Sequence, residues 1–182
     1  MTRVALPEYQ VMIDWDATNW ADTPVFAGDD DISEDVAYID LSRGKEKEEG
    51  NAPASYCQVK LKAGLCEKYS PYKNPKMRIW LPVRVRARHS SDTGFPRPVF
   101  FGYLSAVRIN PNPNRQTVSL YVTDGLDLLA RQVLRQDYNT RTSLNPGGAI
   151  ARIANAAGWP SARRRIDNSE GSILDYPVTG SY

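Results

Sequence analysis

The stretch MRIWLPVRVRAR, residues 77–88, alternates apolar and mostly basic side chains along its length. Because successive side chains of a β-strand point to opposite faces of a sheet, this pattern predicts a strand with one face in a core. Pro82 has no N–H for a ladder, so the strand is expected at a sheet edge or with a bulge near that residue. The expected core face carries Met77, Ile79, Leu81, Val83, Val85 and Ala87, and the opposite face carries Arg78, Trp80, Pro82, Arg84, Arg86 and Arg88.

The same alternation recurs on both sides of this stretch and predicts five more strands. They cover residues 9–15, 36–41, 56–62, 98–109 and 116–123. The turn-rich residues 110–115 separate the last two, which are therefore expected to form a hairpin with a longer loop. In the strand at 56–62, Cys57 shares a side with Val59 and Leu61, which predicts that Cys57 lies in the core.

After Thr123 the spacing of the apolar residues becomes helical. Asp124 is the expected N-cap of a helix that continues to about residue 135. A second helix is expected at residues 147–157, where Ile150, Ile153, Ala154 and Ala157 form a narrow apolar stripe.

The sequence therefore predicts a mainly β fold, a barrel-like or sandwich-like domain with one or two helices, followed by a small α+β segment. The domain is expected to cover residues 1–135 and the small segment residues 136–182. The strand-like residues 172–178 have no evident later partner, so we expect one from additional sequence or from another chain. Charge, Gly and Pro collect at residues 22–34 and 44–53, which are expected to be the least ordered parts and to order against adjacent chains.

The composition argues against several classes of partner. The chain has 182 residues and a net charge of +2, from 23 Lys and Arg against 21 Asp and Glu, so nucleic-acid readout is not expected. No stretch approaches the roughly 18 apolar residues of a membrane span, so we expect a soluble protein made in the cytoplasm without membrane insertion. Cys57 and Cys66 match neither a CxxC metal pattern nor a disulfide framework and are expected to be reduced thiols.

Few residues point to chemistry. The single histidine, His89, ends the arginine-bearing strand, and no carboxylates or thiols at compatible spacing accompany it as metal ligands. A Ser-His-Asp triad stays open because triads are spatial, but no GxSxG elbow supports one. Asp29, Asp30 and Asp31 could supply oxygen ligands to calcium, yet they lack the spacing and turn glycine of an EF-hand loop, which favours a solvated loop. Neither an enzyme, a metal nor a cofactor is therefore expected.

The basic face of the stretch at 77–88 allows three interpretations. Arginine and tryptophan are enriched at protein interfaces, where a guanidinium pairs with carboxylates. A solvated sheet face and a nucleic-acid platform are the alternatives. An interface is favoured, in which the arginines meet the acidic segment of a neighbouring copy. The candidate interface residues are Arg78, Trp80, Arg84, Arg86 and Arg88 on one side and Asp29, Asp30 and Asp31 on the other.

The order of several short motifs resembles that of the distal-tail and baseplate-hub proteins of long-tailed bacteriophages and prophages, often called minor tail proteins. Each motif alone is weak, and the order across nearly the whole chain carries the resemblance. The motifs are a strand ending in Trp15, a strand closing on Arg43-Gly44, a strand leading to Tyr69-Ser70-Pro71, the basic strand 81–88, Phe100-Phe101-Gly102-Tyr103-Leu104, Asp124-Gly125 with Leu128-Leu129, the helix 150–160, and Arg165-Ile166-Asp167.

The resemblance implies a barrel-like tail domain without catalysis, located in the tail tip or baseplate of a virion. It implies a homo-oligomeric ring, trimer or hexamer, that contacts the tail tube and neighbouring tail proteins. Two other functions stay open. A carbohydrate-binding β-module would use the four tryptophans and ten tyrosines to stack on sugars. A tail-associated hydrolase would need two convergent acidic groups, or His89 beside a nucleophile, in a pocket.

Overall fold

The computed structural model describes residues 7–42, 54–89, 96–112, 116–130 and 146–161. The chain divides into two compact units, Met1–Asp127 and Leu128–Tyr182. The first unit is one antiparallel sheet with the strand order β1-β4-β5-β6-β3-β2. Its strands are β1 (Pro7–Ile13), β2 (Val36–Ser42), β3 (Tyr56–Leu61), β4 (Pro82–His89), β5 (Arg97–Asn110) and β6 (Thr117–Thr123). The fold is therefore mainly β, as predicted.

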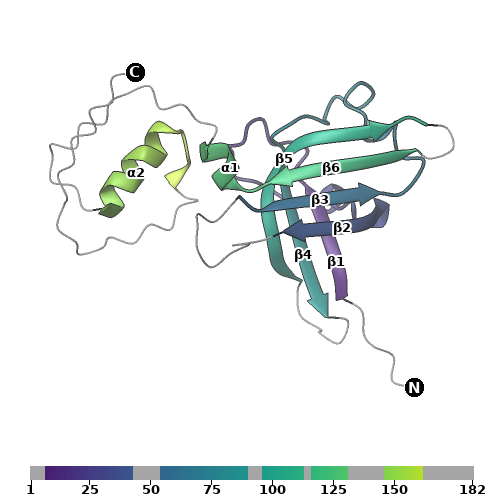
Figure 1. The fold of residues 1–182 in the computed structure, drawn as a ribbon, viewed down its shortest axis with the longest axis horizontal. Coiled ribbons are helices and arrows are strands. Elements are labelled where there is room, and N and C mark those ends of the chain that lie inside the picture. Colours follow the sequence, from purple (N-terminus) through teal and green to yellow (C-terminus); the bar gives the residue numbers. More distant parts are fainter. Residues whose placement is uncertain (1–6, 43–53, 90–95, 113–115, 131–145, 162–182) are drawn as a thin grey trace. The chain divides into compact units, whose positions relative to one another are not determined.

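The long strand β5 curls the sheet into a half-barrel (Figure 1). Residues 97–103 of β5 pair with β4, whereas residues 103–110 pair with β6. A register shift between Leu104 and Ala106 marks an irregularity where the strand passes from one partner to the other. Such bulges bend a strand and increase its twist. As a result β1 and β4 run steeply across the direction of β2, β3 and β6 (Figure 1).

In the described part of the chain, β1 and β2 are the two end strands of the half-barrel and do not pair with each other. A short segment with two 3-10 turns, η1 (Gly28–Asp30) and η2 (Ser33–Asp35), links these strands at one end. There the Ile32 N–H donates to the Val11 carbonyl at 2.9 Å, and Asp31 forms an isolated bridge with Met12. The Ile32 side chain is buried in the core. The prediction that residues 22–34 are poorly ordered is therefore wrong for this segment.

The core fills the concave side of the sheet. Alternate residues of the strands point into it, which confirms the predicted core positions Leu81, Val83 and Val85 and the buried Cys57. Tyr69 and Met77, from the connection between β3 and β4, cover it from outside the strands. The cluster comprises Val11, Ile13, Ile32, Cys57, Val59, Leu61, Tyr69, Met77, Leu81, Val83, Val85, Phe100, Leu104, Val118, Leu120 and Val122.

The strand predicted at residues 77–88 begins five residues later than its alternation suggested. Residues 79 and 80 form a turn in which Trp80 has a φ of 72°, so Ile79 is exposed instead of buried. The Trp80 N–H donates to the Leu104 carbonyl at 2.6 Å and fixes this turn against β5. Pro82 is the first residue of β4, which lies inside the sheet, and the register shift of β4 falls between Val85 and Arg86. The prediction of an edge strand is therefore wrong, and the irregularity expected near Pro82 lies three residues further on. Pro82 itself needs neither, because a strand's first position also tolerates proline.

Two predicted helices are present. Helix α1 (Gly125–Ala130) begins after Asp124, whose carboxylate accepts hydrogen bonds from the N–H groups of Leu126 and Asp127. Helix α2 (Pro146–Ala156) lies in the second unit, and Ala154 is buried whereas Ile150 and Ile153 are exposed.

The predicted domain boundary near residue 135 lies outside the described residues and stays a prediction, as do the expectations for residues 44–53 and 172–178. None of the described helices has the length and apolarity of a membrane span.

Candidate functional site

Three of the five predicted basic-face residues share one side of β4. Arg84, Arg86 and Arg88 alternate with the buried Val83 and Val85, as the pattern predicted. The Arg84 guanidinium lies 4.1 Å from the ring centroid of Phe26, and Arg88 pairs with Glu8 at 2.6 Å. Burial, and after it the charge of Arg86, lowers the pKa of Arg84. Phe26 of the same chain therefore covers part of this face at Arg84, whereas Arg88 is exposed.

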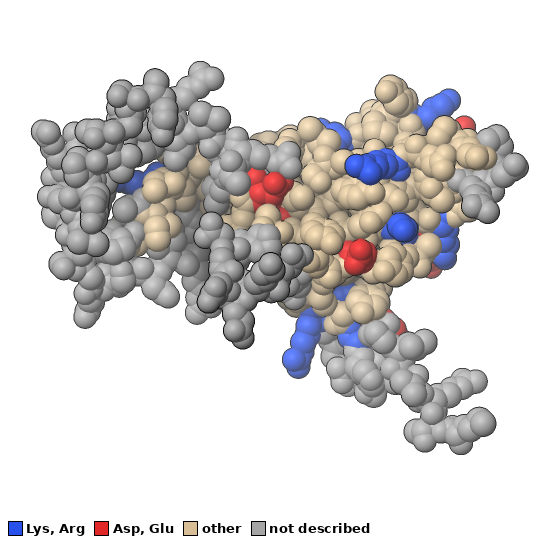
Figure 2. Space-filling view, viewed as in Figure 1, with Lys and Arg blue, Asp and Glu red and all other residues tan. Residues whose placement is uncertain are grey.

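Arg78 and Trp80 do not belong to that row, because both precede β4. The Arg78 guanidinium donates to the Ala17 carbonyl. On the face of the molecule that Figure 2 shows, basic side chains lie apart from one another on a mainly uncharged surface.

Of the acidic residues Asp29, Asp30 and Asp31, the last lies against β1 of its own chain, where it bridges Met12. Asp30 is buried, and its carboxylate accepts a 2.6 Å hydrogen bond from the Ala27 N–H. Asp31 accepts hydrogen bonds from Gln10 at 2.7 Å and from the Ser33 N–H at 2.9 Å. Burial acts to raise the pKa of Asp31, but the hydrogen bonds from Ser33 and Gln10 outweigh it and lower that pKa. Asp29 is exposed, whereas Asp30 is only 7% exposed and offers a neighbour little surface.

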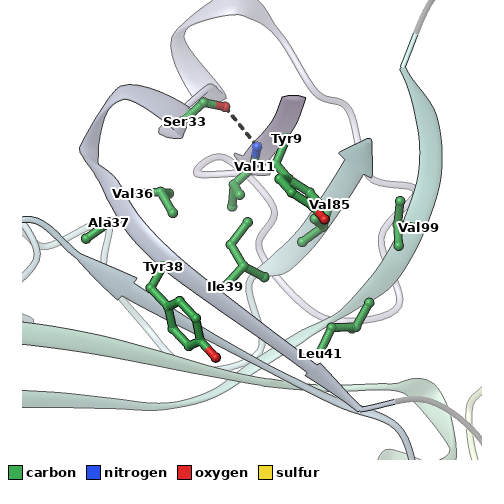
Figure 3. A pocket seen from close by; sticks show the side chains of 10 residues that line it. All are labelled: Tyr9, Val11, Ser33, Val36, Ala37, Tyr38, Ile39, Leu41, Val85 and Val99. Carbon is green, nitrogen blue, oxygen red and sulfur yellow. Dashed lines mark hydrogen bonds between the residues drawn. The ribbon is translucent and has the colours of Figure 1, made fainter. Parts of the chain in front are cut away.

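An apolar groove of about 520 Å³ occupies the opening of the half-barrel (Figure 3). Val11, Val85 and Val99 line one side of it, and Ile39 and Leu41 of β2 line the other. Tyr9 and Tyr38 stand at its rim, exposed by 49% and 54%. We call this set of residues, with Ser33, Val36 and Ala37, the apolar groove. The groove exists because β1 and β2 lie at opposite ends of the described sheet and form no backbone pairing with each other.

A second depression of about 460 Å³ adjoins the groove at Tyr9 and Ser33. Glu8, Gln10, Asp31, Arg86, Arg88 and Pro96 also line it, and we call it the polar hollow. Among the described residues Arg86 forms no ion pair, and its buried Nε has no hydrogen-bond partner. The groove and the hollow thus flank the same edge of β1, one apolar and the other polar.

The two cysteines line neither the groove nor the hollow. Burial, and after it the charge of Asp40, raises the pKa of Cys57 to about 12, which keeps that thiol protonated and unreactive at neutral pH. Cys57 and Cys66 are both free thiols. His89 ends β4, and its side chain lies outside the described residues. Within the described ranges, no three His, Cys, Asp or Glu side chains are grouped so as to hold a metal ion.

The sequence interpretation missed the groove and the hollow. The sequence alone predicted strands at β1 and β2 and showed that Val11, Ile39 and Leu41 are apolar. The sequence did not predict the order of the strands in the sheet. β1 pairs with β4 and β2 pairs with β3, which leaves β1 and β2 as the edge strands.

No protein-family model matches the sequence, and no curated protein matches it.

Proposed function

We propose that this chain is a structural component of a phage tail tip or baseplate, forming a ring or hub at the end of the tail tube. It acts as a trimer or hexamer and contacts the tube and the adjacent tail proteins. The proposal assigns the chain no reaction, no cofactor and no nucleic-acid readout. The motif order given above supplies the tail assignment.

One observation supports an assembly role above the others, namely the unclosed barrel. Edge strands present unpaired N–H and C=O groups, and proteins that do not use such edges usually cover them. Here β2 is an edge strand whose residues are all half-buried or exposed, and it stands beside an apolar groove. Apolar surface of this kind next to an open edge is typical of a binding surface for another chain.

Imaging the chain in its native particle tests the proposal. Electron cryomicroscopy of virions that contain it should show three or six copies around the tail axis, with the groove of each copy covered by another chain. A single copy with solvent around the half-barrel, or a position in the capsid, would contradict the proposal. Mass spectrometry of purified tails provides an independent check of the presence and copy number of the chain.

A carbohydrate-binding module is the second candidate, and it is favoured by two exposed tyrosines on the outer side of the sheet. Tyr38 and Tyr56 are exposed by 54% and 48%. The ammonium group of Lys60 lies 5.6 Å from the Tyr38 ring centroid, so one ring face already has a partner. A glycan array separates the candidates, because a sugar-binding module should bind a defined glycan and lose that binding in Tyr56→Ala.

A further inference from the structure

We propose that the free edge of β2 docks a second copy of this chain, and that the β2 strands of the two copies pair antiparallel with Ile39 facing Ile39. The contact extends the sheet across a two-fold axis, as an isologous interface. It concerns the free chain and stands without the tail assignment. Within the proposed assembly it fits the hexamer, as three pairs.

One end strand of the described sheet, β2, pairs along only one of its two edges. The Lys62 N–H, directly after β3, donates to the Asp35 carbonyl at 2.8 Å and so points toward β2. Backbone groups alternate in direction along an antiparallel strand, so those of Lys60 and Gln58 point the same way. These two residues therefore bond to the residues opposite them in β2.

The residues of β2 that face outward follow from this pairing. Tyr38 and Asp40 lie opposite Lys60 and Gln58, so their N–H and C=O groups are directed to β3. Ile39, between them, directs its N–H and C=O away from β3, and Leu41 does the same. Among the described residues, no hydrogen bond satisfies these outward groups. They can therefore form a ladder with an added strand.

A second β2 is the described strand that has such an edge to offer. The other end strand, β1, is already covered at Val11, whose N–H donates to the Ser33 hydroxyl and whose carbonyl accepts from the Ile32 N–H, both at 2.9 Å. Pairing of β2 with β2 leaves these bonds of β1 in place. The edge that docks and the edge that is docked are then the same surface in two copies.

The length and the charge of β2 select the register. With Ile39 facing Ile39 of the second copy, all seven residues Val36–Ser42 are paired. A register centred on Asp40 would place two carboxylates directly opposite each other, which is destabilising. The register centred on Ile39 instead places Asp40 opposite Tyr38 of the second copy.

The outer face of this register is complementary to itself in charge. Lys60 lies beside Tyr38 in the same chain, with its ammonium group 5.6 Å from the ring centroid. Asp40 is exposed and forms no ion pair with a described residue. In the dimer, its carboxylate joins the row formed by Tyr38 and Lys60 of the second copy. The two-fold axis repeats this contact, so each copy supplies both charges.

The inner face of the added strand covers apolar surface of the groove. Ile39 and Leu41 lie opposite the buried Val59 and Cys57 and therefore share the core face. Both are only half-buried, and Ala37 beside them is exposed. In the dimer, Ile39 packs against Ile39 of the second copy and Leu41 against its Ala37. The pairing thus removes apolar groove surface from water on both sides of the axis.

Disulfide trapping in the full chain tests the register. In a Cys66→Ser background, Ile39→Cys places two thiols opposite each other on the two-fold axis, where the Cα atoms are about 5.5 Å apart, within disulfide range. Ser42→Cys is the matched control, because the two thiols then lie at opposite ends of the paired strands. On a non-reducing gel, mild oxidation should give at least about tenfold more covalent dimer at residue 39. No link at residue 39, or equal yields at both positions, would overturn the inference.

Sedimentation equilibrium tests the charge row without a crosslink. The full chain should dimerise reversibly, and Asp40→Lys should raise the dimer Kd about tenfold, because it brings two ammonium groups together. Adding Lys60→Glu to that variant should restore the dimer. Lys73→Glu, on an exposed residue between β3 and β4, should leave the Kd unchanged. Thermal unfolding should show the same midpoint for all these variants, because the exchanged side chains are exposed.

The two measurements separate this inference from the proposed function. A chain that stays monomeric at every concentration, or one Kd for all the charge variants, would overturn the β2 contact. A dimer in solution without a ring in the particle would remove the tail function alone.

Discussion

The Tyr69 hydroxyl donates a 2.5 Å hydrogen bond to the carboxylate of Asp35, 34 residues earlier in the chain. Tyr69 is fully buried, and its ring centroid lies 6.2 Å from that of Trp15. Lys68 reaches the same carboxylate oxygen at 2.6 Å. Because Asp35 directly precedes β2, these bonds tie the connection between β3 and β4 to the segment beside the apolar groove.

We expect this contact to make the stability of the fold depend on pH. Burial acts to raise the pKa of Asp35, but the hydrogen bonds from Lys68 and Tyr69 outweigh it, so the folded-state pKa lies below the ordinary 3.8. A lowered folded pKa stabilises the fold above the unfolded pKa, and this stability is lost as pH falls through the folded pKa. The stability difference between the wild type and Asp35→Asn should therefore shrink as pH falls from about 6 to about 3 in urea titrations. A difference that stays constant over this range would contradict the expectation.

A buried charge on the core face of β4 should unfold the first unit. Val83 is completely buried between β1 and β5, so Val83→Asp places a carboxylate where no partner is available, at a cost of several kcal/mol. Thermal unfolding followed by circular dichroism should show no cooperative transition. Thr117→Asp is the matched control, because Thr117 is exposed at the start of β6, and it should change the stability by less than about 1 kcal/mol. A normal midpoint for Val83→Asp would reverse the assignment of the two faces.

Asp14 should be the main anchor of the loop that follows β1. Its carboxylate is buried and accepts hydrogen bonds from the N–H groups of Ala17 at 3.0 Å and Val25 at 2.8 Å. Asp14→Ala leaves these donors without their acceptor and should cost about 2–4 kcal/mol in chemical denaturation. Asp16→Ala removes only an exposed pair with Lys76 and should cost less than about 1 kcal/mol. Equal effects of the two substitutions would contradict this role of Asp14.

The elements of this fold could be predicted from the sequence more fully than their arrangement. Period-two alternation located all six strands and placed Leu81, Val83 and Val85 correctly, because local side-chain direction follows from strand geometry. The alternation at 77–81 misled for Ile79, because a positive φ at Trp80 turns the chain there. The Trp80 N–H bonds to the Leu104 carbonyl in that turn, a contact between residues distant in sequence.

The candidate site was less accessible to prediction. Arg84, Arg86 and Arg88 were assigned correctly to one side of β4, whereas Arg78 precedes that strand. Composition could not reveal that Phe26 covers Arg84 or that Asp30 is buried. Residues 22–34 look like a mobile loop by their polarity, whereas hydrogen bonds to Asp14 and the burial of Ile32 order them. Each of these contacts joins residues far apart in the chain, so no local pattern records it.

Gly102 should be irreplaceable at the corner where β5 passes from β4 to β6. A Cβ at this position would overlap the carbonyl oxygen of Thr123 and lie 2.8 Å from the Phe100 ring. Gly102→Ala should therefore lower the thermal midpoint by about 4 °C or more, the shift that corresponds to about 1 kcal/mol in a unit of the size of Met1–Asp127. Gly28→Ala is the control, since a Cβ there meets nothing within 4 Å. If both variants keep the wild-type midpoint, the close approach at the corner is not a constraint.

The first unit should fold without the second, because every member of its buried cluster lies between Val11 and Val122. Asp124 must be kept, since its carboxylate accepts a 2.7 Å hydrogen bond from the Ser55 N–H and also caps α1. At concentrations where the chain is monomeric, a fragment of residues 1–130 should unfold cooperatively with a midpoint within about 3 °C of the full chain. A fragment that ends at Thr123 loses both Asp124 contacts and should be less stable by about 1–3 kcal/mol. If the fragment of residues 1–130 is unfolded or aggregates, the half-barrel needs residues 131–182 to complete its core, and the independence of the two units is wrong.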